Sequence, residues 1–142
     1  TLSEVFHQLE EQRVALDKMV LKPNMVVPGK RSGEEVGVER VAELTVKVLR
    51  ETVPAEVPGI AFLSGGQSAE LATRHLNAMN ALGTNPWTLS FSYGRALQDP
   101  AIAAWGGQAA NRERAQQALC LRARLNGAAS RGSYNDAMEE AA

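Results

Sequence analysis

A lysine interrupts one of the most apolar runs of the chain. The stretch 18–30 reads KMVLKPNMVVPGK, so Lys22 stands between the apolar segments 19–21 and 25–27. Lysine is rarely buried completely without a specific reason. One interpretation is structural, with the apolar stem packed along a strand and the ammonium group in water. The other is chemical, because a partly desolvated amine has a lowered pKa and can condense with a carbonyl group to form a Schiff base.

Two later segments have residue types that suit a phosphate group. Residues 64–67 read SGGQ and residues 92–95 read SYGR, and each segment runs directly into an expected helix. Glycines let backbone N–H groups approach an anion, and a helix N-terminus adds unpaired N–H groups and a favourable dipole. Ser64 adds a hydroxyl group and Arg95 a two-pronged cationic donor. A Gly-Gly pair alone fits an ordinary tight turn equally well, but two such loops with an arginine favour an anion site.

Lys22 and the two glycine-containing segments together predict a phosphorylated carbonyl substrate. The two loops would hold its phosphate, and its carbonyl carbon would lie at Lys22. A nearby cation such as Arg95 would lower the pKa of the amine further. In α/β proteins, reactive groups gather at the C-terminal ends of the strands, so the positions of the strands decide whether these residues meet.

The hydrophobic pattern predicts three strands separated by helices. Short apolar segments with β-branched or aromatic residues indicate strands at 19–27, 59–63 and 87–93. Apolar residues at helical spacing indicate helices at 2–12, 38–52, 68–82 and 111–126, and a short helix within 94–107 that breaks near Pro100. The segment 128–142 offers little to bury and is predicted to be a mobile tail.

Strands that alternate with helices predict βαβ units and a parallel sheet. Three parallel strands leave two open edges, and a complete (β/α)8 TIM barrel takes about 250 residues. The chain has 142 residues. We therefore predict an α/β fold in which residues 1–127 supply roughly the last three strands of a TIM barrel with their helices, followed by the tail 128–142.

The composition excludes several classes of partner. Fifteen Lys and Arg face sixteen Asp and Glu, for a formal net charge of -1. This balance provides no basic surface for nucleic acid and no polybasic membrane anchor. The single cysteine, Cys120, rules out an internal disulfide framework and fits a cytoplasmic location. His7 and His75 have no metal-ligand spacing with it.

The letters LSGGQ at 63–67 match the signature motif of ABC-transporter ATPases. That interpretation requires a GxxxxGK[ST] phosphate loop and an apolar strand ending in Asp-Glu after the signature. The sequence contains neither of them. We therefore reject an ATPase function.

Four long motifs follow one another along the chain. They are VLKPNMV at 20–26, FLSGGQS at 62–68, NPWTLSFSYGRALQ at 85–98 and AWGGQ at 104–108. These motifs closely resemble the C-terminal part of class I fructose-1,6-bisphosphate aldolases, and the connecting segments 50–60 and 75–80 resemble it as well. The resemblance implies a (β/α)8 barrel, usually a cytoplasmic homotetramer without metal or other cofactor. It also implies reversible cleavage of fructose 1,6-bisphosphate to dihydroxyacetone phosphate and glyceraldehyde 3-phosphate, in glycolysis and gluconeogenesis.

The resemblance also implies roles for particular residues. Lys22 would be the Schiff-base lysine. The residues at the phosphate of the ketone half would be Ser64, Gly65, Gly94 and Arg95, with Ser92 beside them.

Two departures from the family pattern lead to further expectations. The family's catalytic carboxylates and two further active-site lysines come from earlier strands, so we expect these 142 residues alone to be catalytically incomplete. Many family members also end in a tyrosine whose flexible tail helps to protonate the enamine. This chain ends NDAMEEAA, and we do not assign that role to Tyr134.

Two alternative functions stay open on the sequence. One is a different Schiff-base lyase that acts on another phosphorylated sugar, and a comparison of fructose 1,6-bisphosphate with other phosphosugars such as fructose 1-phosphate would distinguish it. The other is a non-catalytic fragment that keeps a phosphate pocket.

Overall fold

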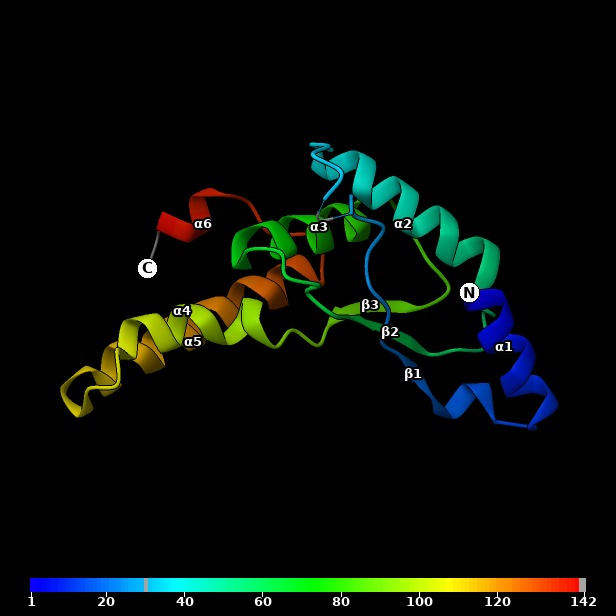
Figure 1. Cartoon of the computed structure of the whole chain (residues 1–142), viewed down its shortest axis with the longest axis horizontal. Helices are drawn as coiled ribbons and strands as arrows, with labels where there is room; N and C mark the ends of the chain where they lie inside the picture. The colour runs from blue at the N-terminus through cyan, green and yellow to red at the C-terminus, as the bar shows by residue number, and fades with distance from the viewer. Residues whose placement is uncertain (30, 141–142) are drawn as a thin grey trace.

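Helices and parallel strands alternate along the chain (Figure 1). The computed structural model describes residues 1–29 and 31–140. Its elements are α1 (Leu2–Glu11), the 3-10 turn η1 (Leu16–Lys18), β1 (Val20–Leu21), α2 (Val38–Thr52), β2 (Gly59–Phe62), α3 (Ala69–Ala81), β3 (Thr88–Phe91), α4 (Arg95–Trp105), the 3-10 turn η2 (Ala109–Asn111), α5 (Arg112–Ala129) and α6 (Ala137–Glu140). None of these described helices is long and apolar enough to cross a membrane.

The three strands form one parallel sheet in the order β1-β2-β3. Val20 pairs with Gly59 and Gly59 pairs with Thr88, so the three strands begin at the same level. Helix α2 connects β1 to β2, and α3 connects β2 to β3. The βαβ order and the parallel sheet predicted from the hydrophobic pattern are confirmed.

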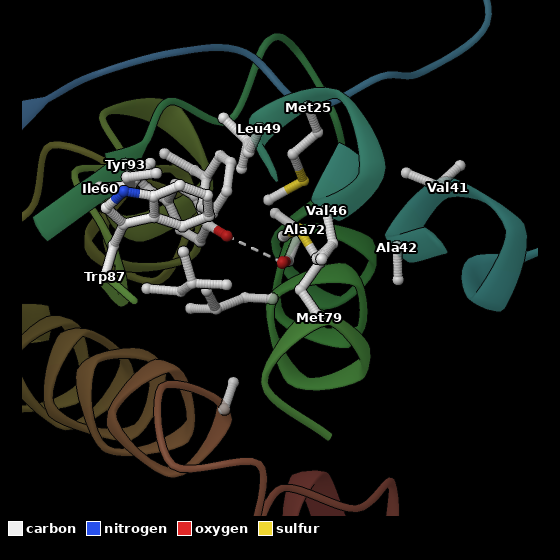
Figure 2. Close-up of a cluster of buried hydrophobic side chains, with 14 of the residues drawn as sticks. Met25, Val41, Ala42, Val46, Leu49, Ile60, Ala72, Met79, Trp87 and Tyr93 are labelled. Carbon is white, nitrogen blue, oxygen red and sulfur yellow. Dashed lines mark hydrogen bonds between the residues drawn. The ribbon is translucent and has the colours of Figure 1, made fainter. Parts of the chain in front are cut away.

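One face of the sheet carries the hydrophobic core. Ile60 and Phe62 of β2 are buried and alternate with half-buried residues, as expected for a strand with one covered face. Helices α2 and α3 lie over this face (Figure 1). In Figure 2, Met25 extends from the loop after β1 toward Val46 of α2 and Ala72 of α3, so the core continues past the end of the sheet.

The first strand is much shorter than predicted. We expected a strand at 19–27, but β1 contains only Val20 and Leu21. Pro23 has no N–H group to donate, and the backbone beyond it finds other partners. The Val26 N–H group donates to Thr45 Oγ1 of α2 at 2.9 Å. Beyond Pro23, the segment after β1 is therefore held against α2 by a side chain instead of by a neighbouring strand. The other two strands stop short of the predicted ends, β2 by one residue and β3 by two.

Two helix predictions were also wrong. Pro100 lies inside the continuous helix α4 and does not break it. The proline removes one hydrogen bond in the middle of α4, but the helix packs along α5, and it ends only where Gly106 adopts a left-handed conformation. Helix α5 continues through Gly127 to Ala129, past the predicted end at residue 126. Burial of Leu125 and Ala129 favours this extension over the helix-breaking tendency of glycine.

Helices α4 and α5 lie side by side and form an arm that extends away from the sheet (Figure 1). The end of α5 returns to α3, where the Thr73 hydroxyl group donates to Asn126 Oδ1 at 2.7 Å. Both side chains are buried. The arm is therefore attached to the core through α3.

Residues beyond α5 pack more than the composition suggested. Tyr134 is buried, and its N–H group donates to Asn77 Oδ1 of α3 at 2.9 Å. Its hydroxyl group donates to Glu139 of α6, and the same carboxylate pairs with the buried Arg122 of α5. Whether the segment 128–142 moves as a tail stays a prediction.

The core position of α3 can be tested by a pair of leucine variants. Leu76 is fully buried, so Leu76→Ala should lower the free energy of unfolding by roughly 2–5 kcal/mol. Leu82, just beyond the end of the same helix, is 45% exposed, and Leu82→Ala should cost less than about 1 kcal/mol. Urea unfolding followed by circular dichroism measures both values. Equal losses would contradict the packing of α3 described above.

Candidate functional site

The three strands end at one edge of the sheet, and two backbone hydrogen bonds continue the pairing into the loops. The Leu63 N–H group donates to the Pro23 carbonyl at 3.0 Å, and the Ser92 N–H group donates to the Phe62 carbonyl at 2.8 Å. These bonds hold the segments after β1, β2 and β3 at the same level. The structure therefore brings together the three segments that the sequence singled out.

Lys22 lies on the sheet face opposite the core. Leu21 pairs with the buried Ile60, so the next residue of each strand points the other way. Ala61 pairs with Ser90 on that opposite face, and Lys22 follows Leu21 in the same register. No helix of the described residues covers this face (Figure 1), and Val20 on it is 63% exposed. We call it the open face.

The predicted desolvation of Lys22 is wrong for the described residues. The side chain is exposed, because none of the residues that the structure describes packs over the open face there. Its position at the end of a strand is as predicted, but its environment is not. Any apolar surroundings for this amine would have to come from outside these three strands.

The loop after β2 has the backbone conformation that its glycines allow. Gly65 has φ +61° and Gly66 has φ +87°, both in the left-handed region that favours glycine. A Cβ atom at Gly65 would lie 2.6 Å from Asn24 Oδ1, so the loop after β1 touches the loop after β2. Ser64 is buried, at 5% exposure. Glycine at position 65 therefore serves both the turn and the contact between loops.

A pair of side chains that the sequence analysis did not select holds this loop. Gln67 Nε2 donates to the Ser64 carbonyl at 3.0 Å, and Gln67 Oε1 lies 2.5 Å from His75 Nδ1 of α3. Burial lowers the pKa of His75, and the carboxylate of Glu39 opposes this shift. The sequence did contain a signal, because His75 falls at helical spacing with the inward-facing Ala72 and Met79, where an apolar residue is the ordinary choice.

The loop after β3 is fixed to the same helix. Tyr93 is buried, and its hydroxyl group donates to the Ala72 carbonyl of α3 at 2.8 Å (Figure 2). Burial raises the pKa of Tyr93. Gly94 is the N-cap of α4 and Arg95 its first residue, and both are exposed, whereas Ser92 is half-buried. An exposed helix N-terminus with an arginine in its first turn provides several donors for an anion.

The described residues form no metal-binding cluster at this edge. Within residues 1–29 and 31–140, no group of three His, Cys, Asp or Glu side chains could hold a metal ion. Tyr134 lies against α3, α5 and α6, where burial and a hydrogen bond to Glu139 raise its pKa. The open face and its edge therefore offer an amine, hydroxyl groups, backbone donors and a guanidinium group.

Comparisons with known proteins find one family. The model of the family "Fructose-bisphosphate aldolase class-I" matches residues 1–142. Fructose-bisphosphate aldolase B of Sparus aurata is 52% identical over 134 residues, which is 94% of this chain and 37% of the relative. The cytosolic fructose-bisphosphate aldolase 4 of Arabidopsis thaliana is 50% identical and is covered to 34%. The chain thus spans little more than a third of the length of these relatives.

A solved structure has the same fold. It is the fructose-bisphosphate aldolase of Plasmodium falciparum, in a ternary complex with TRAP and a small-molecule inhibitor, with a TM-score of 0.92 and 47% identity. The match covers 94% of this chain and 39% of that one. The chain therefore forms part of a TIM barrel, as the strand pattern predicted.

The contact between Gly65 and Asn24 can be separated from backbone strain. Gly65→Ala must adopt a left-handed φ and must also displace Asn24, whereas Gly33→Ala adopts φ +70° with nothing within 4 Å. Gly33→Ala should cost about 1 kcal/mol of unfolding free energy, and Gly65→Ala should cost more. Adding Asn24→Ala to Gly65→Ala should recover part of the loss. Urea unfolding of the unchanged chain, Gly65→Ala, Asn24→Ala and their double variant gives the coupling, and a coupling of zero would show that the loops are independent.

Proposed function

Because the chain belongs to the class I fructose-bisphosphate aldolase family, we propose that it serves reversible cleavage of fructose 1,6-bisphosphate to dihydroxyacetone phosphate and glyceraldehyde 3-phosphate in glycolysis and gluconeogenesis. The observation that carries the proposal is the shared edge of the sheet, where the segment that contains Lys22 ends level with two loops suited to phosphate. An amine beside an anion site on an open barrel face matches a phosphorylated ketone. No metal or other cofactor is needed for this chemistry.

Lys22 supplies the covalent step in this proposal. Its neutral amine attacks the ketone carbon, a C–N bond forms, and the carbonyl oxygen leaves as water after protonation. The resulting protonated imine withdraws electrons, so the C3–C4 bond can break once the C4 hydroxyl group loses its proton, which leaves an enamine on the lysine and frees the aldehyde. The aldehyde departs first, a proton returns to the enamine carbon to restore the imine, and water then hydrolyses the imine and releases dihydroxyacetone phosphate.

The two loops hold the phosphate of the ketone half. The donors that we assign to it are the hydroxyl group of Ser64, the backbone N–H groups of Gly65 and Gly94, and the guanidinium group of Arg95, with Ser92 beside them. Binding energy at the phosphate fixes the ketone carbon near the amine, which replaces a bimolecular encounter by an oriented one. The loops therefore act as the anchor of the reaction and Lys22 as its nucleophile.

Two requirements of the reaction are not met by the described residues. The exposed Lys22 lacks the apolar surroundings that favour a neutral amine. In addition, no carboxylate stands directly after β1, β2 or β3 to move protons on the substrate hydroxyl groups. We therefore assign these tasks to barrel strands other than these three, and the 142-residue segment alone should be inactive in turnover.

We infer the cellular location and the partners from the family as well. Cytosolic isozymes occur among the relatives, and we assign a cytoplasmic location to this protein. The partners that we assign are a phosphorylated sugar and further copies of the complete protein, as a homotetramer. Neither nucleic acid nor a membrane is part of this proposal.

The lysine is tested by trapping the imine. The chain is incubated with dihydroxyacetone phosphate, reduced with borohydride and mapped by peptide mass spectrometry. We expect the reduced adduct at Lys22, while Lys18 and Lys47, which are also exposed, serve as internal controls for unspecific imines. An adduct at the control lysines with Lys22 unmodified in the folded protein would overturn the assignment.

The phosphate anchor is tested by comparing two ketones. Arg95→Ala should lower the yield of the Lys22 adduct with dihydroxyacetone phosphate by at least about tenfold, because a charged hydrogen bond is lost. The yield with dihydroxyacetone, which has no phosphate group, should stay unchanged. Arg112→Ala, at the exposed start of α5, is the matched control. Equal effects of Arg95→Ala on both ketones would contradict a phosphate role.

A further inference from the structure

His75 and Gln67 form a buried support behind the loop after β2. His75 is 2% exposed on the core side of α3, and Gln67 is half-buried directly before the helix. The two side chains are joined by the short contact between His75 Nδ1 and Gln67 Oε1, at 2.5 Å. The buried ring of His75 is thus directed at Gln67, which leads to the loop after β2.

The surroundings determine the direction of this hydrogen bond. Gln67 Nε2 lies 3.0 Å from the Ser64 carbonyl oxygen and 3.5 Å from Met25 Sδ, and both of these atoms are acceptors. The amide nitrogen must face them, so the amide oxygen faces the ring and accepts from Nδ1–H. A neutral ring with its proton on Nδ1 leaves Nε2 bare, and Nε2 has no partner among the described residues.

The protonated ring is disfavoured at this position. A proton on Nε2 would place a buried N–H group where no described acceptor is in reach. Burial accordingly lowers the pKa of His75, although Glu39 of α2 acts in the opposite direction. Two other carboxylates, Glu34 and Glu35 in the loop before α2, line the same pocket as His75 and Gln67. At neutral pH the ring is therefore a neutral single donor to Gln67.

The contact between His75 and Gln67 acts on the phosphate loop through one peptide bond, the one between Ser64 and Gly65. The Ser64 carbonyl accepts from both the N–H group and the side-chain amide of Gln67, each at 3.0 Å. In a planar trans peptide, C=O and N–H point in opposite directions. Holding the Ser64 carbonyl toward Gln67 thus directs the N–H group of Gly65 away from Gln67.

We propose that His75 and Gln67 are positioning residues of the phosphate site, with the ring holding the Gln67 amide and the amide fixing the Ser64–Gly65 peptide so that its N–H group faces the bound phosphate. The inference rests on the proposed function for the identity of the anion. The loop after β3 does not depend on this pair, because Tyr93 holds it through Ala72. The two halves of the anion site are therefore supported separately.

Sulfate binding to the ¹⁵N-labelled chain tests the role. Sulfate keeps two negative charges near neutrality, so its own titration does not interfere, and the amide shifts of Gly65 and Gly94 report both loops at pH 7.5 and constant ionic strength. His75→Leu removes the donor and should weaken sulfate binding roughly three- to tenfold. In the absence of sulfate it should move the Gly65 signal and leave that of Gly94 in place. A purely structural defect would move both signals.

Rescue and control variants complete the experiment. His75→Asn places an N–H donor close to the position of Nδ1, so its sulfate affinity should return to within about twofold of the unchanged chain. His7→Leu removes an exposed histidine of α1 and should have no effect. Gln67→Leu should match His75→Leu, and the double variant should lose nothing further. Imidazole ¹⁵N shifts should show the proton of His75 on Nδ1.

The possible failures are distinguishable. If the unchanged chain binds no sulfate at these amides, the proposed phosphate site is overturned together with its support. If the unchanged chain and His75→Leu bind sulfate equally, or if His75 carries its proton on Nε2, only the positioning role is overturned.

Discussion

The backbone hydrogen-bond ladder of the parallel sheet is the constraint on which the site depends. It aligns Val20, Gly59 and Thr88 at one end and reaches Pro23, Leu63 and Ser92 at the other. Because parallel strands all run the same way, a common start gives a common end, and three loops far apart in sequence arrive at one edge. A shift of one residue in any strand would turn Lys22 or its neighbours toward the core, since side chains alternate between faces.

Different residues of helix α3 support different parts of the site and of the fold. Its carbonyl at Ala72 receives the hydroxyl group of Tyr93, its His75 ring contacts Gln67, and Thr73 fastens the arm of α4 and α5 through Asn126. Leu76 and Met79 of the same helix are buried in the core. Polar groups that hold loops are thus mounted on a helix whose packing leaves it little freedom, which is the arrangement that keeps a binding site in shape.

Local chemistry and periodicity identified most of the fold and the exposed part of the site. The short apolar segment at 59–63 and the helical spacing before and after it indicated the βαβ order, and the glycines marked the loops. The predictions that failed concern features that tertiary contacts determine. The Thr45 hydroxyl group accepts a hydrogen bond from the backbone that was expected to continue β1. Packing of α4 against α5 keeps the helix continuous through Pro100. Lys22 is exposed because no described residue covers it. The sequence assigned no role to His75, because its role depends on the contact with Gln67, eight residues away and outside the helix.

The two outer strands of the sheet affect how copies of this chain associate with one another. In the described residues β1 and β3 each have one neighbouring strand, so each outer strand keeps a row of unpaired N–H and C=O groups. Val20 adds an apolar side chain on the open face beside one of these rows. Such edges invite strand addition from a second chain. The geometry that suits these strands to the interior of a barrel also makes the isolated three-stranded unit prone to edge-to-edge association at high concentration.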